Sequence, residues 1–196
     1  YMKFNTLLII LVVVMVGMTA VNMFMAFNNR LDIETLSSSS NYTYDYEGRA
    51  TLDIETEILF NKPNQMTQFL EQYEKPKEQQ QADFQESITK FAESFKRIMT
   101  VEDFQSTATV LGTNRVKVVE HAVIAGFSAV EEGVVNTDMG DMEFDLTGVE
   151  SSLTLTIPVG AKVVSVEPEP SSTIGGNIFI WSNTGKTAFP KIRFGQ

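Results

Sequence analysis

The distribution of apolar residues divides the chain into two parts. From Phe4 to Phe27 no residue carries a charge, and the few polar side chains do not form a polar face. At about 1.5 Å per helical residue this segment would extend roughly 36 Å, enough to cross a hydrocarbon core of about 30 Å. Lys3 and Arg30 flank it. The pattern predicts an apolar N-terminal helix, with residues 1–36 as its bounds, placed in a membrane or a filament core.

The chain becomes polar directly after this segment. The run Ser37–Ser40 has no face that could pack against a core, so residues 37–48 are predicted to form a polar, flexible linker. Residues 49–196 have the mixed composition of a folded domain. This part is expected to be an extracellular globular domain.

The globular part begins and ends with strand patterns. Arg49–Phe60 alternates apolar and polar residues with a period of two, which predicts a strand with one buried face. Alternating segments recur toward the C-terminus, separated by turn signals about every 8–12 residues, as in an antiparallel sheet or sandwich. These predicted strands lie near residues 116–125, 141–146, 153–157, 163–166, 178–181 and 192–194.

Two helical patterns interrupt the strands. Asn64 is predicted to cap a short helix that ends before Pro76, and apolar residues recur at helical spacing from Phe84 to Met99. The apolar stripe of this second helix is expected to pack on the sheet, with a partner-binding groove as the alternative. The predicted fold class is therefore α+β: a long N-terminal apolar helix, then a mostly antiparallel β domain with one or two amphipathic helices inserted.

Charge and cysteine content exclude several classes of protein. The formal net charge is −10, and no basic stripe offsets it, so nucleic-acid binding is not expected. The chain has no cysteine, which excludes disulfides, thiolate metal sites and a cysteine nucleophile.

The sequence shows no catalytic apparatus. His121 is the only histidine, and a strand residue in a polar or half-buried position is its expected role. No phosphate-binding loop, nucleophile elbow or dinucleotide-binding glycine pattern occurs. The chain is therefore predicted not to be an enzyme and to need no cofactor, with an unrecognised hydrolase site as the least favoured alternative.

One acidic segment could bind a cation. Oxygen-bearing side chains occur at short spacing from Asn136 to Asp145, and Asp138, Asp141 and Glu143 are the candidate calcium ligands among them. Gly140 is not where a twelve-residue calcium loop requires its glycine, and no closing bidentate glutamate follows. As alternate residues of a strand, the same side chains would form its solvated face.

Asn41-Tyr42-Thr43 is the only N-glycosylation sequon. Its position between the apolar segment and the domain predicts exposure outside the cell. Asn41 is therefore predicted to carry a glycan, with a chance tripeptide as the alternative.

The first thirty residues resemble the mature N-terminus of the type IV pilin superfamily, which includes archaeal adhesion pilins and archaellins. Tyr1 followed by the run TLLIILVVVMV carries the resemblance, whereas Asn5 stands where bacterial pilins have a glutamate, and Lys3 places a charge in a region that is normally neutral. The resemblance implies that a prepilin peptidase removes a short leader and that pilus assembly machinery then extracts the subunit from the membrane.

The resemblance also implies a structural role. Copies of the chain would form a helical homopolymer through close packing of their N-terminal helices. The residues expected at this assembly interface are Leu8, Leu11, Val14, Gly17, Val21 and Phe24. The main expectation is thus a subunit of an extracellular adhesion filament, membrane-inserted before assembly. The alternative is a single-pass membrane-anchored extracellular domain that binds a ligand or a partner protein.

Overall fold

The computed structural model describes residues 32–146 and 150–196. Strands predominate. The first two are β1 (Ile33–Tyr44) and β2 (Ala50–Phe60), which are followed by helix α3 (Pro63–Leu70), a 3₁₀ helix (Glu71–Glu74) and helix α4 (Lys77–Glu93). The remaining strands are β3 (Thr100–Val110), β4 (Arg115–Ala125), β5 (Ala129–Glu131), β6 (Val134–Asn136), β7 (Glu143–Leu146), β8 (Glu150–Thr156), β9 (Lys162–Glu167), β10 (Ser172–Ile174), β11 (Ile178–Ser182), β12 (Gly185–Ala188) and β13 (Lys191–Gly195).

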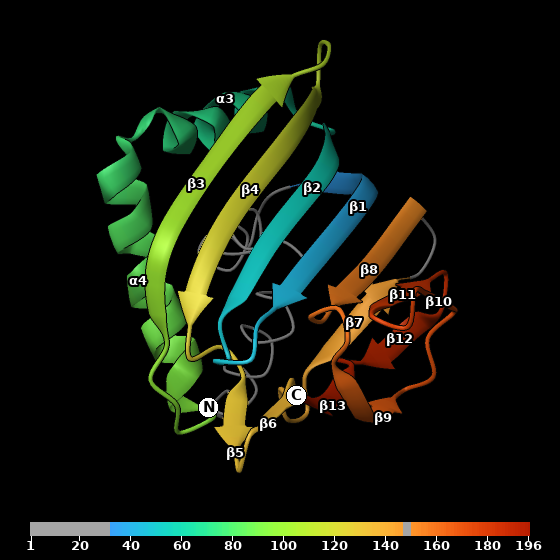
Figure 1. Cartoon of the computed structure of the whole chain (residues 1–196). Coiled ribbons are helices and arrows are strands. Elements are labelled where there is room, and N and C mark those ends of the chain that lie inside the picture. Colours follow the sequence, from blue (N-terminus) through green and yellow to red (C-terminus); the bar gives the residue numbers. More distant parts are fainter. Residues whose placement is uncertain (1–31, 147–149) are drawn as a thin grey trace, which may run out of the picture.

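A seven-stranded sheet forms the main layer, in the order β10-β11-β8-β1-β2-β4-β3 (Figure 1). Its neighbouring strands are antiparallel except β1 and β8, which are parallel and pair from Ser37 opposite Glu150 to Thr43 opposite Thr156. The long strands β1, β2, β4 and β3 follow from extended alternation of apolar and polar residues, which buries one face of the sheet.

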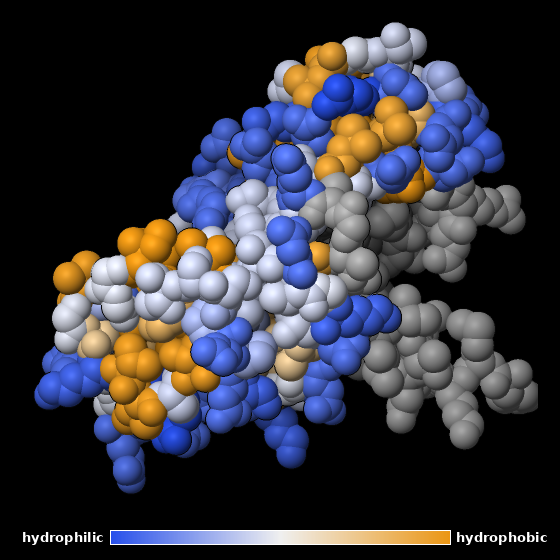
Figure 2. All heavy atoms as spheres, turned by 90° about the vertical axis from the view of Figure 1, so that its right-hand side faces the viewer, coloured by the Kyte–Doolittle hydropathy of each residue, from blue (hydrophilic) through white to orange (hydrophobic). Residues whose placement is uncertain are grey.

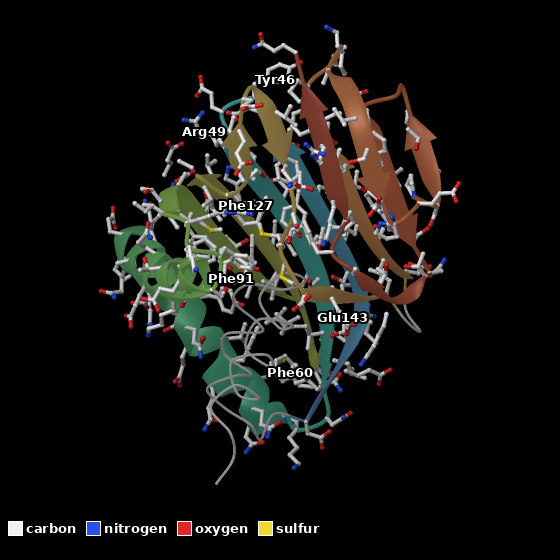
Figure 3. All side chains as sticks on the ribbon, turned by 90° about the horizontal axis from the view of Figure 1, so that it is seen from below. Tyr46, Arg49, Phe60, Phe91, Phe127 and Glu143 are labelled. Atoms are coloured by element: carbon white, nitrogen blue, oxygen red, sulfur yellow. The ribbon has the colours of Figure 1, made fainter. Side chains whose placement is uncertain are left out.

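The helices and a smaller sheet cover the buried face. Helix α4 runs along β3 (Figure 1), and the rings of Phe84 on α4 and Phe104 on β3 stack with centroids 4.2 Å apart. The second sheet, in the order β5-β6-β13-β9, contributes Ile192 and Phe194 to the same core. In Figure 3 the labelled ring of Phe127 lies in this interior between the two sheets.

A smaller apolar cluster lies at one end of the main sheet. Phe69 of α3 packs on Phe60 of β2, with ring centroids 5.2 Å apart, and Val116 and Val118 of β4 complete the cluster. Phe60 lies at the end of the molecule opposite to Tyr46 and Arg49 of the β1–β2 turn (Figure 3). The long strands therefore have one apolar cluster near each end.

The α+β assignment is wrong, because within residues 32–146 and 150–196 the domain is a mostly β structure with two short α-helices. The predicted helix is also wrong where the structure describes it: Ile33–Leu36 belong to β1. The rest of that helix lies outside the described residues. No helix of the described part is long and apolar enough to cross a membrane.

Most of the predicted polar linker (residues 37–48) is a strand, because residues 37–44 belong to β1. Ser37–Ser40 pair with β2 on one side and β8 on the other, so β1 lies inside the main sheet. Two neighbouring strands satisfy the backbone groups of these serines, and Ser40 is buried. A run without apolar side chains therefore adopts regular structure, because its partners provide the hydrogen bonds and the burial.

Individual elements of the globular part are confirmed, with shifted bounds. The predicted strand over 49–60 is β2, and the turn at Gly112 joins β3 to β4. Helix α4 begins seven residues before Phe84 and ends at Glu93 instead of Met99. Lys96 has a left-handed backbone (φ 53°), which ends the helical stripe, so Ile98 is exposed instead of packed on the sheet.

Candidate functional site

The buried face of the main sheet contains a carboxylate. Glu120 of β4 is only 3% exposed, and the Oγ of Ser106 on β3 donates a hydrogen bond of 3.2 Å to its Oε1. Burial, and secondarily the negative charge of Glu120, raise the pKa of Tyr42 far above its ordinary value, so its phenol stays protonated. The same two causes raise the pKa of Tyr73.

Polar residues next to Glu120 form a band between the two apolar clusters. Its buried members are Ser40, Thr56, Ser106 and Ser151. Among the described residues the Oγ1 of Thr56 has no hydrogen-bond partner. These hydroxyls supply weak donors and acceptors. Glu120 and His121 are adjacent in β4 and therefore point to opposite faces of the sheet, so none of these buried serines can form a Ser–His relay with His121.

His121 lies on the outer face of the main sheet and is 40% exposed, so its predicted strand position is confirmed. Its Nδ1 lies 2.7 Å from Oδ1 of Asp53, and its Nε2 lies 4.0 Å from Oδ2 of Asp103. Both ring nitrogens thus face carboxylates, and no hydroxyl of residues 32–146 or 150–196 is seen paired with the ring. The arrangement is an ion-pairing site on a solvated surface.

Asn41 occupies the same outer face. It is exposed in the middle of β1, directly opposite Asp53 of β2 and Thr154 of β8. Its side chain is accessible to solvent, although the segment is a central strand and not the loop expected from the sequence. Glycosylation of Asn41 stays a prediction.

The structure does not bring the candidate calcium ligands together. Oδ1 of Asp138 lies 3.2 Å from Nζ of Lys191 and accepts a hydrogen bond from the backbone N–H of Gly140. Asp141 lies in a turn, and Glu143 belongs to β7. In the part of the chain that the structure describes, no three His, Asp or Glu side chains form a group that could hold a metal ion. The calcium hypothesis therefore gains no support.

Exposed aliphatic side chains gather near the end of β8. We name this group the distal surface; its members are Val159, Val163, Val164 and Ile174. Val159 is 88% exposed in the turn after β8, and Val164 on β9 is 59% exposed. Asn177 joins the β10–β11 turn to the end of β8, because its backbone carbonyl accepts the N–H of Ile157 and its side-chain amide donates to the carbonyl of Ile157. Figure 2 shows apolar side chains over this region at the lower left.

Local backbone geometry explains why β9 exposes two adjacent valines. The pairing of β9 with β13 has an irregularity at Val164: Ser165 lies opposite Arg193, whereas Val163 lies opposite Phe194. Such a bulge interrupts the alternation of a strand, so neighbouring side chains do not divide between a buried and an exposed face. In the described sheets β9 pairs only with β13 and is an edge strand.

The distal surface was not expected from the sequence. Residues 163–166 were predicted only to form a strand, with no exposed apolar surface. The available signal was the consecutive pair of valines, which breaks a period of two, next to the apolar turn Pro158-Val159-Gly160. The expected assembly residues Leu8, Leu11, Val14, Gly17, Val21 and Phe24 lie outside the described residues.

Comparison with protein families gives one match over most of the chain. Residues 33–195 match the family described as "Domain of unknown function (DUF4897)". The predicted membership of the type IV pilin superfamily is therefore wrong. The apolar segment that carried the pilin resemblance lies before residue 33, whereas the residues that match a family form the β domain. No curated protein sequence matches the chain.

Solved structures resemble the chain only distantly. The folded domain of the LppM protein of Mycobacterium tuberculosis matches with a TM-score of 0.39 and 11% identity, over 85% of this chain and 92% of that domain. An M1 zinc metallopeptidase from Deinococcus radiodurans has a TM-score of 0.29 and 10% identity, and a putative protease from Parabacteroides distasonis has 0.34 and 8%. These two matches cover 84% of this chain but only 39% and 40% of the peptidase chains.

Proposed function

The chain belongs to the DUF4897 family, and from its own surface we propose that it is a membrane-anchored extracytoplasmic domain that binds a partner protein and catalyses no reaction. The filament role expected from the sequence depended on the pilin resemblance, and we do not retain it. The single observation that carries the proposal is the distal surface, where exposed aliphatic side chains from a turn and two edge strands lie together.

The position of the distal surface supports a binding role. Asp32 directly precedes β1, whereas Thr43 near the end of β1 is opposite Thr156 at the end of β8. At about 3.3 Å per strand residue these two ends of β1 are roughly 36 Å apart. If the apolar segment Phe4–Phe27 holds the chain at a membrane, the distal surface faces away from the lipid, where a soluble or surface-bound protein can reach it.

Exposure of these aliphatic side chains to water is unfavourable in free energy, and burial against a partner would remove this cost. Isolated apolar residues on a surface are ordinary, whereas a contiguous group marks an interaction site. The exposed carboxylates Glu167 and Glu169 follow Val164 in sequence, and the whole chain carries a net charge of −10. The partner that fits this surface is a protein with an apolar contact centre and a basic rim.

Site-specific photo-crosslinking in cells that make the full chain tests the proposal. A photoreactive amino acid replaces Val163 in one strain and Val119 in another; these valines are matched in exposure, at 41% and 42%, but Val119 lies on the outer face of the main sheet. We expect one defined protein adduct at position 163 and none at 119. Glu167→Lys with Glu169→Lys should abolish that adduct, because the partner's rim is basic.

Two results would refute the binding proposal. Equal adducts at positions 163 and 119 would show nonspecific contact, and an adduct composed only of this chain would replace the partner with a second copy. Membrane anchoring has its own readout: the full chain should float with added lipid vesicles in a density gradient, and a chain that sediments as free protein contradicts the anchor.

A further inference from the structure

A second exposed apolar feature lies at the opposite end of the domain. The β3–β4 hairpin turns through residues 111–114, and Val110 and Leu111 at its tip are 48% and 45% exposed. The tip extends beyond the other strands at the top of Figure 1, and apolar side chains are visible at this end in Figure 2. Two consecutive aliphatic residues at a turn have no role in either apolar cluster of the described core.

Hydrogen bonds place the start of the domain beside this tip. The backbone carbonyl of Asp32 accepts the N–H of Asn61, and the Nδ2 of Asn61 donates to Oδ1 of Asp32. One residue earlier, the N–H of Phe60 donates to the carbonyl of Asn114, whose side-chain amide donates back to the carbonyl of Phe60. Asp32 and the hairpin turn are thus two strand spacings apart, about 10 Å.

Chain length limits how far the apolar segment can lie from Asp32. Phe27 precedes Asp32 by five residues, and a fully extended chain covers at most about 3.6 Å per residue, or roughly 18 Å. If the segment Phe4–Phe27 enters a bilayer, the surface of that bilayer therefore lies within roughly 18 Å of Asp32, at the end of the domain that carries the hairpin tip.

Charges near the tip do not oppose contact with lipid headgroups. Arg115 pairs with Glu57 at 2.5 Å, and Lys62 lies 3.9 Å from Asp32. These pairs are locally neutral, although the whole chain carries a net charge of −10. Arg115 and Lys62 thus compensate the carboxylates of Glu57 and Asp32, which reduces the repulsion that this end of an acidic protein would meet at an anionic surface.

We propose that the β3–β4 hairpin tip inserts Val110 and Leu111 into the membrane interface. This inference rests on the proposed anchoring of the chain. The two side chains would enter the boundary between headgroups and acyl chains, which extends about 5–10 Å in depth. Together with the anchor they would give the domain a second point of attachment. The domain would then stand upright, with its distal surface directed away from the bilayer.

Depth-dependent fluorescence quenching tests the hairpin contact. The chain has no cysteine, so Leu111→Cys, Val119→Cys and Val159→Cys each carry one environment-sensitive fluorophore without further changes. Each full-length variant is reconstituted into vesicles of phosphatidylcholine and phosphatidylglycerol that contain a lipid with a quencher near the headgroup. Val119 is a matched control for Leu111 because their exposed fractions are 42% and 45%.

We expect several-fold greater quenching and a blue-shifted emission at position 111, and neither change at positions 119 and 159. Chains that float with the vesicles but show equal quenching at all three positions would overturn the hairpin contact and leave the anchor intact. Chains that do not float would overturn the anchor and, with it, this inference.

Discussion

Ser106 on β3 donates a hydrogen bond of 3.2 Å from its Oγ to Glu120 on β4, across the pair in which the two residues lie directly opposite each other. Both side chains are buried, at 5% and 3% exposure. A buried carboxylate depends on such donors, because transfer from water without a compensating bond is costly. The polar band that contains this pair separates the two apolar clusters of the sheet.

Ser106→Ala should therefore lower the free energy of unfolding by about 1–3 kcal/mol, the usual cost of leaving a buried acceptor with one donor fewer. Urea denaturation followed by circular dichroism measures the change. Thr107→Ala is the matched control, since Thr107 is the next residue of β3 and is exposed; its effect should stay within about 0.5 kcal/mol. Equal effects of both variants would mean that Ser106 does not stabilise the buried carboxylate.

Three glycines allow backbone strain to be separated from close packing. Gly48 has a φ of 80°, and a Cβ there would lie 2.6 Å from the carbonyl oxygen of Ser128. Gly133 has a similar φ of 78° with no atom near the added Cβ, and Gly112 has neither a positive φ nor a neighbour within 4 Å.

Replacement by alanine should destabilise the domain most at Gly48, less at Gly133 and least at Gly112. We expect a change within about 0.5 kcal/mol at Gly112 and about 1–2 kcal/mol at Gly133, with a larger loss at Gly48, where the left-handed backbone and the collision act together. Chemical denaturation of the three variants measures the series. If Gly48→Ala and Gly133→Ala cost the same, the close approach of the Ser128 carbonyl adds nothing to the cost of the left-handed backbone.

Trp181 of β11 is fully buried, and its Nε1 donates a hydrogen bond of 3.2 Å to the carbonyl of Pro168. Trp181→Phe should lower stability by about 1–3 kcal/mol through the lost bond and the unfilled volume. Trp181 is the only tryptophan, so its emission in the unmodified chain should shift to longer wavelength on unfolding. An emission maximum already at long wavelength in the folded protein would contradict the burial of Trp181.

Stability should fall in acid because two exposed carboxylates have cationic partners. The guanidinium of Arg49 donates to both oxygens of Glu102 and lowers the pKa of Glu102 below its ordinary 4.5. The ammonium group of Lys77 lowers the pKa of Asp103 below its ordinary 3.8. A lowered folded-state pKa contributes stability that is complete above the ordinary value and is lost as the pH falls through the folded value.

The urea midpoint should therefore decrease from about pH 5 to about pH 3. Glu102→Gln should reduce this dependence, and added salt should weaken it, since the groups are exposed and screened. An unchanged pH profile in Glu102→Gln would show that the Arg49 pair does not contribute to acid sensitivity.

The strands and helices with strong periodicity could be predicted from the sequence, whereas the serine strand could not. Ala50–Phe60 alternates so regularly that its buried face was predicted correctly. In β1 the same alternation is carried by Ser40, Tyr42 and Tyr44. Serines give no hydropathy signal, and only pairing with β2 and β8 makes this segment a strand.

Some of the candidate surface features could be predicted from the sequence and others could not. The strand position of His121 follows from local pattern, whereas Asn41 is exposed on a central strand and not in the linker expected from the sequence. The distal surface does not follow from local pattern, because it combines a turn with two edge strands, and the bulge at Val164 determines which side chains point outward. The proximity of Leu111 to Asp32 likewise depends on strand order.

The sequence alone determined an uncharged segment of 24 residues (positions 4–27), an acidic composition without cysteine, and most of the long strands. These are properties of residue type and local period. Tertiary structure alone decided that Ser37–Ser40 lie within a sheet, that Val159 and Ile174 share one end of the domain, and that the hairpin tip lies at the other. Strand partners far apart in the chain set these relationships, and local periodicity contains no information about them.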